Sequence, residues 1–272
     1  MPKETKITQD SLRGCLPTEY KDLRIYVFDQ LPSTNDCAKQ LASEGAPDGT
    51  IVIAHKQSSG KGRLGRSFFS PEEGIYMSII IRPEADDFQP GLVTCAAAAA
   101  VCEAIEAVTD HNALIKWVND IYVEGKKVCG VLTEGVTDHE TGKLDAAIVG
   151  IGINTTTAGF PEELLQIAGA VAGEYSKSQL ASSVISRLLD HTAEISDASA
   201  VSPPSFMTSY REKNLVPGKQ ITVYKGIYKN DPSEVPSRPA RALDIDDNGG
   251  LIVLYSDGSR ETLTSGEISI RI

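Results

Sequence analysis

Two segments about fifty residues apart carry the residue types of an anion-binding site. In the first, 57–66, glycines alternate with Lys61, Arg63 and Arg66; in the second, 116–127, an apolar strand precedes Asp120 and a pair of lysines. Glycine lets the backbone approach an anion, arginine forks onto phosphate or carboxylate oxygens, and a carboxylate can hold Mg²⁺ beside phosphates. Such a set suits a site in which a carboxylic acid attacks a nucleotide and the mixed anhydride is then held.

The glycine-rich segment 60–65 has the spacing GxGxxG without the context of a dinucleotide fingerprint. The residues after it, 67–71, predict a loop rather than a helix, and the GK[ST] ending of a P-loop is absent. Successive glycine N–H groups could form an anion nest, with Arg63 and Arg66 beside it. A solvated basic hairpin is the alternative, and this segment alone does not separate the two.

The second segment offers one carboxylate and one inward lysine. Asp120 follows Asn119 in a tight turn, so it is either an ordinary β-turn aspartate or a carboxylate that holds Mg²⁺ on nucleotide phosphates. Strand alternation allows only one of Lys126 and Lys127 to point inward, and Lys127 lies beside the apolar strand core. An inward lysine needs an anionic partner, which a substrate carboxylate would supply. Lys116 could face the same pocket or solvent.

Apolar patterns predict the elements that position these residues. Strands are expected at 24–28, 50–55, 74–82, 114–118, 121–123, 127–134 and 146–154, and helices at 37–44, 90–108, 178–196 and 206–213. Five short strands at 221–224, 238–245, 251–255, 261–263 and 268–270 predict a small SH3-like β-barrel. The sequence therefore predicts an α+β chain: a catalytic domain over 1–213, with a mixed β-sheet flanked by helices, and a barrel domain over 214–272.

Composition excludes several classes of protein. The 272 residues carry a net charge of −11, which argues against a general nucleic-acid binder. Five cysteines, an odd number without CxxC spacing, indicate reduced thiols rather than a disulfide framework or a zinc site. The N-terminus has no apolar signal region and no apolar run is long enough to span a bilayer. We therefore expect a cytoplasmic protein with no membrane partner.

Five motifs occur in an order that resembles the biotin protein ligases, also called biotin–[acetyl-CoA-carboxylase] ligases. They are 33–35 (Ser-Thr-Asn), Gln57 with the loop 60–66, 116–120 (Lys-Trp-Val-Asn-Asp), 127–130 (Lys-Val-Cys-Gly) and 150–154 (Gly-Ile-Gly-Ile-Asn). The resemblance runs from about residue 25 to the end, where 265–270 is similar to the family's small barrel. It implies the biotin–lipoyl ligase fold, related to class II synthetases, and a two-step reaction. ATP and biotin would give biotinyl-5′-AMP, and a lysine of a biotin carboxyl carrier protein, such as a subunit of acetyl-CoA carboxylase, would then accept the biotin.

The resemblance also implies roles for individual residues. It places in the biotin site Ser33, Thr34, Asn35, Gln57, Lys61, Gly62, Arg63, Lys127 and Gly130. It places at the nucleotide Arg63, Arg66, Phe68, Lys116, Asn119 and Asn154. Lys127, Arg63 and Asp120 would be the catalytic residues, and Asp120 would also hold Mg²⁺.

The chain departs from the family pattern at several points. Lys61 replaces the first arginine of the usual Gly-Arg-Gly-Arg loop, which keeps the positive charge but loses the forked geometry. Val118 replaces a proline, and Phe68 stands where the family often has tryptophan. Only about thirty residues precede Ser33, too few for the winged helix-turn-helix of bifunctional members. We therefore expect a monofunctional ligase that does not bind DNA.

Three alternatives stay open. A lipoate–protein ligase would share the catalytic fold and the adenylate chemistry. A transcriptional regulator could sense biotin without ligating it, and a degenerate module could only bind it. The carrier protein, the formation of a homodimer and the role of a polar insertion at 225–239 are not decided by the sequence.

Overall fold

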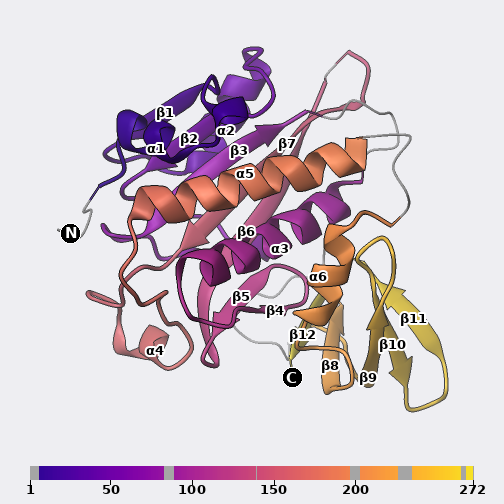
Figure 1. The fold of residues 1–272 in the computed structure, drawn as a ribbon. Coiled ribbons are helices and arrows are strands. Elements are labelled where there is room, and N and C mark those ends of the chain that lie inside the picture. Colours follow the sequence, from indigo (N-terminus) through magenta and orange to yellow (C-terminus); the bar gives the residue numbers. More distant parts are fainter. Residues whose placement is uncertain are drawn as a thin grey trace.

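The computed structural model describes residues 6–82, 89–138, 140–196, 203–225, 235–264 and 268–271. Within these ranges a seven-stranded mixed sheet has the order β1-β2-β3-β7-β6-β5-β4 (Figure 1). Its strands are β1 (Ile25–Phe28), β2 (Ile51–Ala54), β3 (Ile75–Ile81), β4 (Leu114–Lys116), β5 (Asp120–Val123), β6 (Lys126–Thr137) and β7 (Leu144–Ile153). Only the pair β1–β2 is parallel; the other neighbours are antiparallel. The predicted mixed sheet is confirmed.

Helices cover both faces of this sheet. They are α1 (Gln9–Cys15), α2 (Thr34–Ser43), α3 (Pro90–Val108), α4 (Glu162–Leu165), α5 (Lys177–Ser196) and α6 (Phe206–Glu212). The long helices α3 and α5 lie side by side over one face (Figure 1), in a core with Ile53 and Met77. Helix α2 packs on the opposite face, where Ala38 and Ala42 contact Val52. Alternate residues of each strand therefore serve two cores.

Helix α3 is the central helix of the larger core. Its alanines at 96–100 are fully buried, and side chains this small let α3 approach both α5 and the sheet. By length and hydropathy it is the one helix among the described residues that could cross a membrane, but 72% of that stretch is buried inside the protein. The same composition is expected of a core helix that is covered on all sides.

The C-terminal part forms a separate small sheet of five antiparallel strands among the described residues, in the order β11-β10-β9-β8-β12. The strands are β8 (Gln220–Lys225), β9 (Ser237–Ile245), β10 (Leu251–Tyr255), β11 (Arg260–Leu263) and β12 (Ile268–Arg271). Alternate residues such as Ile221, Val223 and Val253 are buried, as the period-two pattern predicts. The SH3-like barrel expectation is confirmed. The central part of the polar insertion, 226–234, lies outside the described residues.

The two parts of the chain meet through backbone and side-chain contacts. Around the predicted division at 213/214, Ile115 of the edge strand β4 donates to Lys213 O at 2.8 Å and accepts from Leu215 N at 2.9 Å. The side chain of Arg211 donates to Ile245 O at 2.9 Å and pairs with Asp247. The small sheet is thus fixed to the edge of the large one.

Candidate active site

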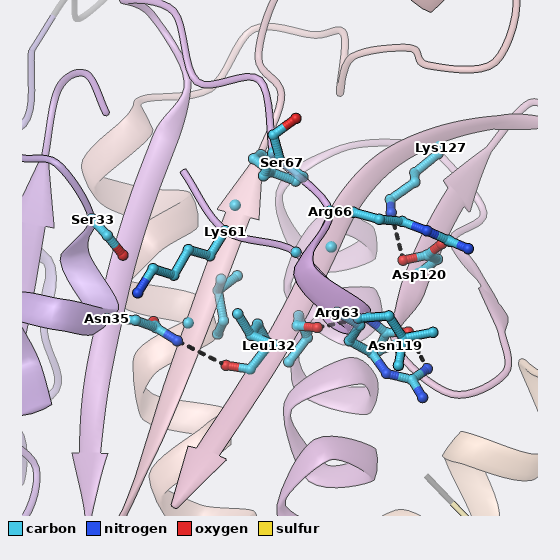
Figure 2. Close-up of a pocket in the computed structure, with 18 of the residues that line it drawn as sticks. Ser33, Asn35, Lys61, Arg63, Arg66, Ser67, Asn119, Asp120, Lys127 and Leu132 are labelled. Atoms are coloured by element: carbon cyan, nitrogen blue, oxygen red, sulfur yellow. Dashed lines mark hydrogen bonds and ion pairs between the residues drawn. The ribbon is translucent and has the colours of Figure 1, made fainter. Parts of the chain in front are cut away.

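A cavity of about 210 Å³ collects residues from distant parts of the sequence (Figure 2). Its walls come from the start of α2, the glycine loop, the β4–β5 turn, and strands β6 and β7. Of the predicted site residues, it is lined by Ser33, Thr34, Asn35, Gln57, Lys61, Gly62, Arg63, Arg66, Phe68, Lys116, Asn119, Asp120, Lys127 and Gly130. The two segments singled out for their chemistry therefore face one another across a single space.

The floor of the cavity is bare backbone. A Cβ atom on Gly150 would lie 2.1 Å from Asn35 Oδ1, and one on Gly152 would lie 2.5 Å from the ring of Phe68. On the neighbouring strand β6, a Cβ on Gly130 would lie 3.3 Å from the same ring. The absence of side chains at these glycines leaves room for the Asn35 amide and the Phe68 ring, which line the cavity. Gly150 and Gly152 were not predicted as lining residues, although a glycine–x–glycine pair on one face of a strand signals a close approach.

The start of α2 supplies a buried polar wall. Ser33 caps the helix, and its hydroxyl accepts from Asp36 N at 3.4 Å. Thr34 donates its backbone N–H to Gln57 Oε1 at 2.8 Å, and Gln57 Nε2 donates to Ser70 Oγ at 3.0 Å. Because the helix N-terminus and Gln57 share these bonds, the wall is fixed before any ligand arrives.

The glycine loop folds into a tight hairpin over the cavity. Gly62 N donates to Arg66 O at 2.7 Å, and Phe68 N donates to Gly60 O at 2.8 Å. Between them, residues 63–65 make a 3₁₀ turn in which Leu64 and Gly65 have positive φ, 59° and 72°. The sequence predicted a loop without a following α-helix, and the structure agrees.

Arg63 and Lys61 play different parts in this loop. The Arg63 guanidinium donates to Asn119 Oδ1 at 3.2 Å, joining the loop to the β4–β5 turn (Figure 2). Burial lowers the pKa of Arg63 from its usual value, and arginine stays charged at neutral pH even so. The Lys61 ammonium instead pairs with Asp36 at the exposed side. Of the loop's cations, Arg63 is therefore the one that bonds to Asn119.

Asp120 and Lys127 form an ion pair of 2.6 Å at the edge of the cavity. Their side chains are 28% and 31% exposed, so a ligand can reach both. Asp120 begins β5 rather than lying within the turn, which spans 117–119. The neighbouring Lys126 turns away and donates to Leu165 O at 3.1 Å. The prediction that Lys127 is the inward lysine is confirmed.

Trp117 is a core residue as predicted and has a second role, whereas Asn154 lies away from its predicted place. Trp117, interpreted as a core residue, is 4% exposed and also lines the cavity, while its indole N–H donates to Gly249 O at 2.9 Å. Asn154, predicted at the nucleotide, is not among the cavity-lining residues. Its amide donates to Gly169 O at 3.0 Å, so its contact is with the segment that follows α4.

The cavity residues could hold a magnesium ion that is also bound by the phosphates of a nucleotide, but not a magnesium ion alone. Among the described residues no group of three or more His, Cys, Asp or Glu side chains could hold a metal. Asp120 is the carboxylate that lines the cavity. Mg²⁺ commonly takes one or two carboxylates and completes its shell with phosphate oxygens and water. A single aspartate fits that arrangement and not a resident metal centre. All five cysteines are free thiols, as expected.

Comparison with known protein sequences identifies the class of protein to which this fold and cavity correspond. The sequence profile of the biotin/lipoate A/B protein ligase family matches residues 27–154, and that of the biotin protein ligase C-terminal domain matches residues 236–271. The first profile spans the cavity-lining residues and the second most of the small barrel. The two matched regions are the two domains of the biotin protein ligases.

Individual relatives agree with this assignment. The bifunctional ligase/repressors BirA of Bacillus spizizenii and Bacillus subtilis are each 38% identical over 173 residues, which is 62% of this chain and 53% of theirs. The chain thus matches about half the length of these relatives. The biotin–[acetyl-CoA-carboxylase] ligase of Mycobacterium tuberculosis is 28% identical over 257 residues, 89% of this chain and 87% of that protein.

A solved structure covers nearly all of the fold. The biotin protein ligase from Aquifex aeolicus in complex with biotin and ATP has a TM-score of 0.74 at 25% identity, over 91% of this chain and 98% of that one. The arrangement of the mixed sheet, its helices and the small barrel is therefore the arrangement of that ligase.

Proposed function

We propose that the chain is an ATP-dependent ligase that converts biotin to biotinyl-5′-AMP and transfers the biotin to a lysine of a biotin carboxyl carrier protein. The observation that carries the proposal is the meeting of Arg63, Asn119 and the Asp120–Lys127 ion pair in one cavity with a buried polar wall. The matches to this family give the reaction, and the cavity supplies the groups that the reaction needs.

The two ends of the cavity suit the two ends of biotin. The wall at Ser33, Thr34 and Gln57 offers hydroxyl and amide groups to the ureido ring, which carries N–H donors and one carbonyl acceptor. Lys127 would receive the valerate carboxylate, which would compete with Asp120 for the ammonium group.

In the first step a carboxylate oxygen of biotin attacks the α-phosphorus of ATP, and pyrophosphate leaves. Lys127 and Arg63 offset the negative charge that gathers on the reacting oxygens, and they do so best in a site that excludes water. Mg²⁺ that arrives with the nucleotide, held in part by Asp120, would offset the charge of the leaving pyrophosphate. The protein's own contribution is to hold the two anions together in line.

In the second step the amine of a carrier lysine attacks the acyl carbon, the acyl–phosphate bond breaks and AMP leaves. Until then the anhydride must be kept from water. The glycine loop lies over the cavity and is tied across it by Arg63, so it is placed to shield the intermediate. We place the reaction in the cytoplasm, in agreement with the free thiols.

A lipoate–protein ligase is the second candidate, since the first family profile covers both enzymes. The match of residues 236–271 to a biotin protein ligase C-terminal domain favours biotin. The deciding experiment is mass spectrometry of a carrier domain incubated with the protein, ATP, Mg²⁺ and either biotin or lipoate. A mass gain with biotin alone supports the proposal. A gain with lipoate alone overturns the substrate, and no gain with either overturns the ligase activity.

A further inference from the structure

A chain of hydrogen bonds runs behind the α2 wall and ends at a carboxylate that does not line the cavity. Asn35 is 4% exposed, and its Nδ2 donates to Glu134 Oε2 at 2.7 Å and to Leu132 O at 3.3 Å. Asn35 Oδ1 lies 2.6 Å from the hydroxyl of Ser78. Every polar atom of this carboxamide is therefore engaged by the protein itself.

The Glu134 carboxylate, together with the more distant Leu132 carbonyl, decides which way the amide faces. Glu134 Oε1 accepts from Lys39 Nζ at 2.5 Å, and an ionised carboxylate can only accept hydrogen bonds. The NH₂ group of Asn35 must then face Glu134, and its oxygen must face Ser78. The bare backbone of Gly150 leaves room for that oxygen, since a Cβ there would lie 2.1 Å from it.

The orientation passes on to the cavity through two hydroxyl groups. Because Asn35 Oδ1 can only accept, the single proton of Ser78 is donated to it. Ser78 Oγ also lies 2.8 Å from Thr34 Oγ1, and Thr34 Oγ1 lies 3.2 Å from Gln57 Oε1. The proton of Thr34 goes to one of these two oxygens. The lone pairs of Thr34 are then left for a donor in the cavity.

We propose that Glu134 is a positioning residue for the ligand: through Asn35 and Ser78 it makes Thr34 a hydrogen-bond acceptor toward the ureido N–H groups. The inference rests on the proposed function, because the ureido ring is the part of biotin that offers such donors. Glu134 acts from outside the cavity and touches no substrate. Lys39 compensates its charge and leaves its acceptor role unchanged.

A matched pair of variants separates the acceptor from the ion pair. Glu134→Gln keeps the shape but can present either an oxygen or an NH₂ group to Asn35, so the longer bond to Leu132 O is left to favour one orientation. We expect the KM for biotin to rise about tenfold while kcat at saturating biotin stays within about twofold. In Lys39→Gln the carboxylate is retained, and both constants should stay within about twofold of wild type.

Exchanging the two functional groups gives a rescue. In the double variant Asn35→Asp/Glu134→Gln, the new amide donates to the new carboxylate, which still accepts from Ser78. We expect it to recover part of the biotin KM lost in Glu134→Gln. Asn35→Asp alone sets two carboxylates together and should be the weakest binder. If Glu134 were only structural, the double variant would be worse than both single variants.

The assay is steady-state transfer of biotin to a carrier domain, followed by mass spectrometry, with circular dichroism to confirm folding. Desthiobiotin, which keeps the ureido group and lacks the sulfur ring, should show the same rise in KM. Glu134→Asp, whose shorter side chain withdraws the carboxylate from Asn35, should raise the KM in the same direction if Glu134→Gln does not fold. Wild type without biotin transfer would defeat the proposed function. Wild-type transfer with an unchanged KM in the variants, or a rise confined to biotin, would overturn the role of Glu134.

Discussion

The indole N–H of Trp117 donates to the carbonyl of Gly249 at 2.9 Å, across the junction between the large sheet and the small barrel. Trp117 lines the cavity from the turn that also carries Asn119. Gly249 belongs to the turn between β9 and β10, and the hydroxyl of Tyr210 donates to Val118 O at 3.0 Å nearby. The turn 117–119, which carries site residues, is therefore held in place by hydrogen bonds to the C-terminal part of the chain.

This relationship predicts that Gly249 is intolerant of a side chain. Its φ is +80°, and a Cβ atom would lie 2.4 Å from the buried sulfur of Cys95. Gly249→Ala should lower the free energy of unfolding by roughly 2–5 kcal/mol, from backbone strain and overpacking together. Gly218→Ala is the control, because its φ is +84° with nothing within 4 Å, and it should cost only about 1–2 kcal/mol. Urea denaturation compares them; equal losses would contradict the contact with Cys95.

Lys127 is expected to be essential, and its strand neighbour is not. Lys127→Ala removes the cation at the reacting carboxylate and leaves Asp120 without its partner, so kcat/KM for biotin should fall at least about a hundredfold. Lys126→Ala removes a lysine whose ammonium bonds to the carbonyls of Leu165 and Gln166. That variant should retain activity within about threefold of wild type. Similar losses in the carrier-domain assay would show that charge near the strand, and not position, is what matters.

Arg63 is expected to contribute to making the intermediate but to matter most for holding it. Arg63→Gly removes the bond to Asn119 that ties the loop across the cavity, so adenylate should form and escape. The measurement is the fraction of labelled adenylate that stays with the protein after rapid gel filtration. Retention equal to wild type in Arg63→Gly would refute this role.

A side chain at Gly152 is expected to clash with the Phe68 ring, and removal of that ring should relieve the clash. Gly152→Ala would bring a methyl group to 2.5 Å from the Phe68 ring, which must then move. Since Phe68 is the predicted stacking residue for adenine, the KM for ATP should rise several-fold. Adding Phe68→Ala removes the obstructing ring, so the double variant should be no worse than Phe68→Ala alone. Additive losses would place the effect of Gly152 elsewhere.

Much of the fold follows from local pattern. The alanine-rich helix begins at Pro90 and ends at Val108 as predicted, because its composition and its N-terminal proline mark it clearly. The β-branched runs fixed the strands to within a few residues. Helix α4 was missed, since four residues, Glu162–Leu165, carry no periodic signal. Its place beside β6 depends on backbone bonds to Lys127 that no local pattern records.

The site shows a similar division. The order of the motifs predicted that Arg63, Asp120 and Lys127 share one site, and all three line the cavity. Side-chain type and strand alternation were enough for this prediction. Trp117 is buried in the core as predicted. That it also lines the cavity and donates to a glycine 132 positions away is a long-range contact that no local pattern records. The role of Glu134 was equally out of reach, because it depends on a network that joins three elements.

The bare floor of the cavity has a consequence for anyone who wishes to change what it accepts. Gly130, Gly150 and Gly152 already contribute as few atoms as an amino acid can, so every substitution there subtracts space. Enlarged ligands can be accommodated only by shortening groups on the α2 wall or in the glycine loop. Engineering toward bulkier analogues should therefore begin at those two walls, and libraries that vary the strand glycines should yield narrower specificity.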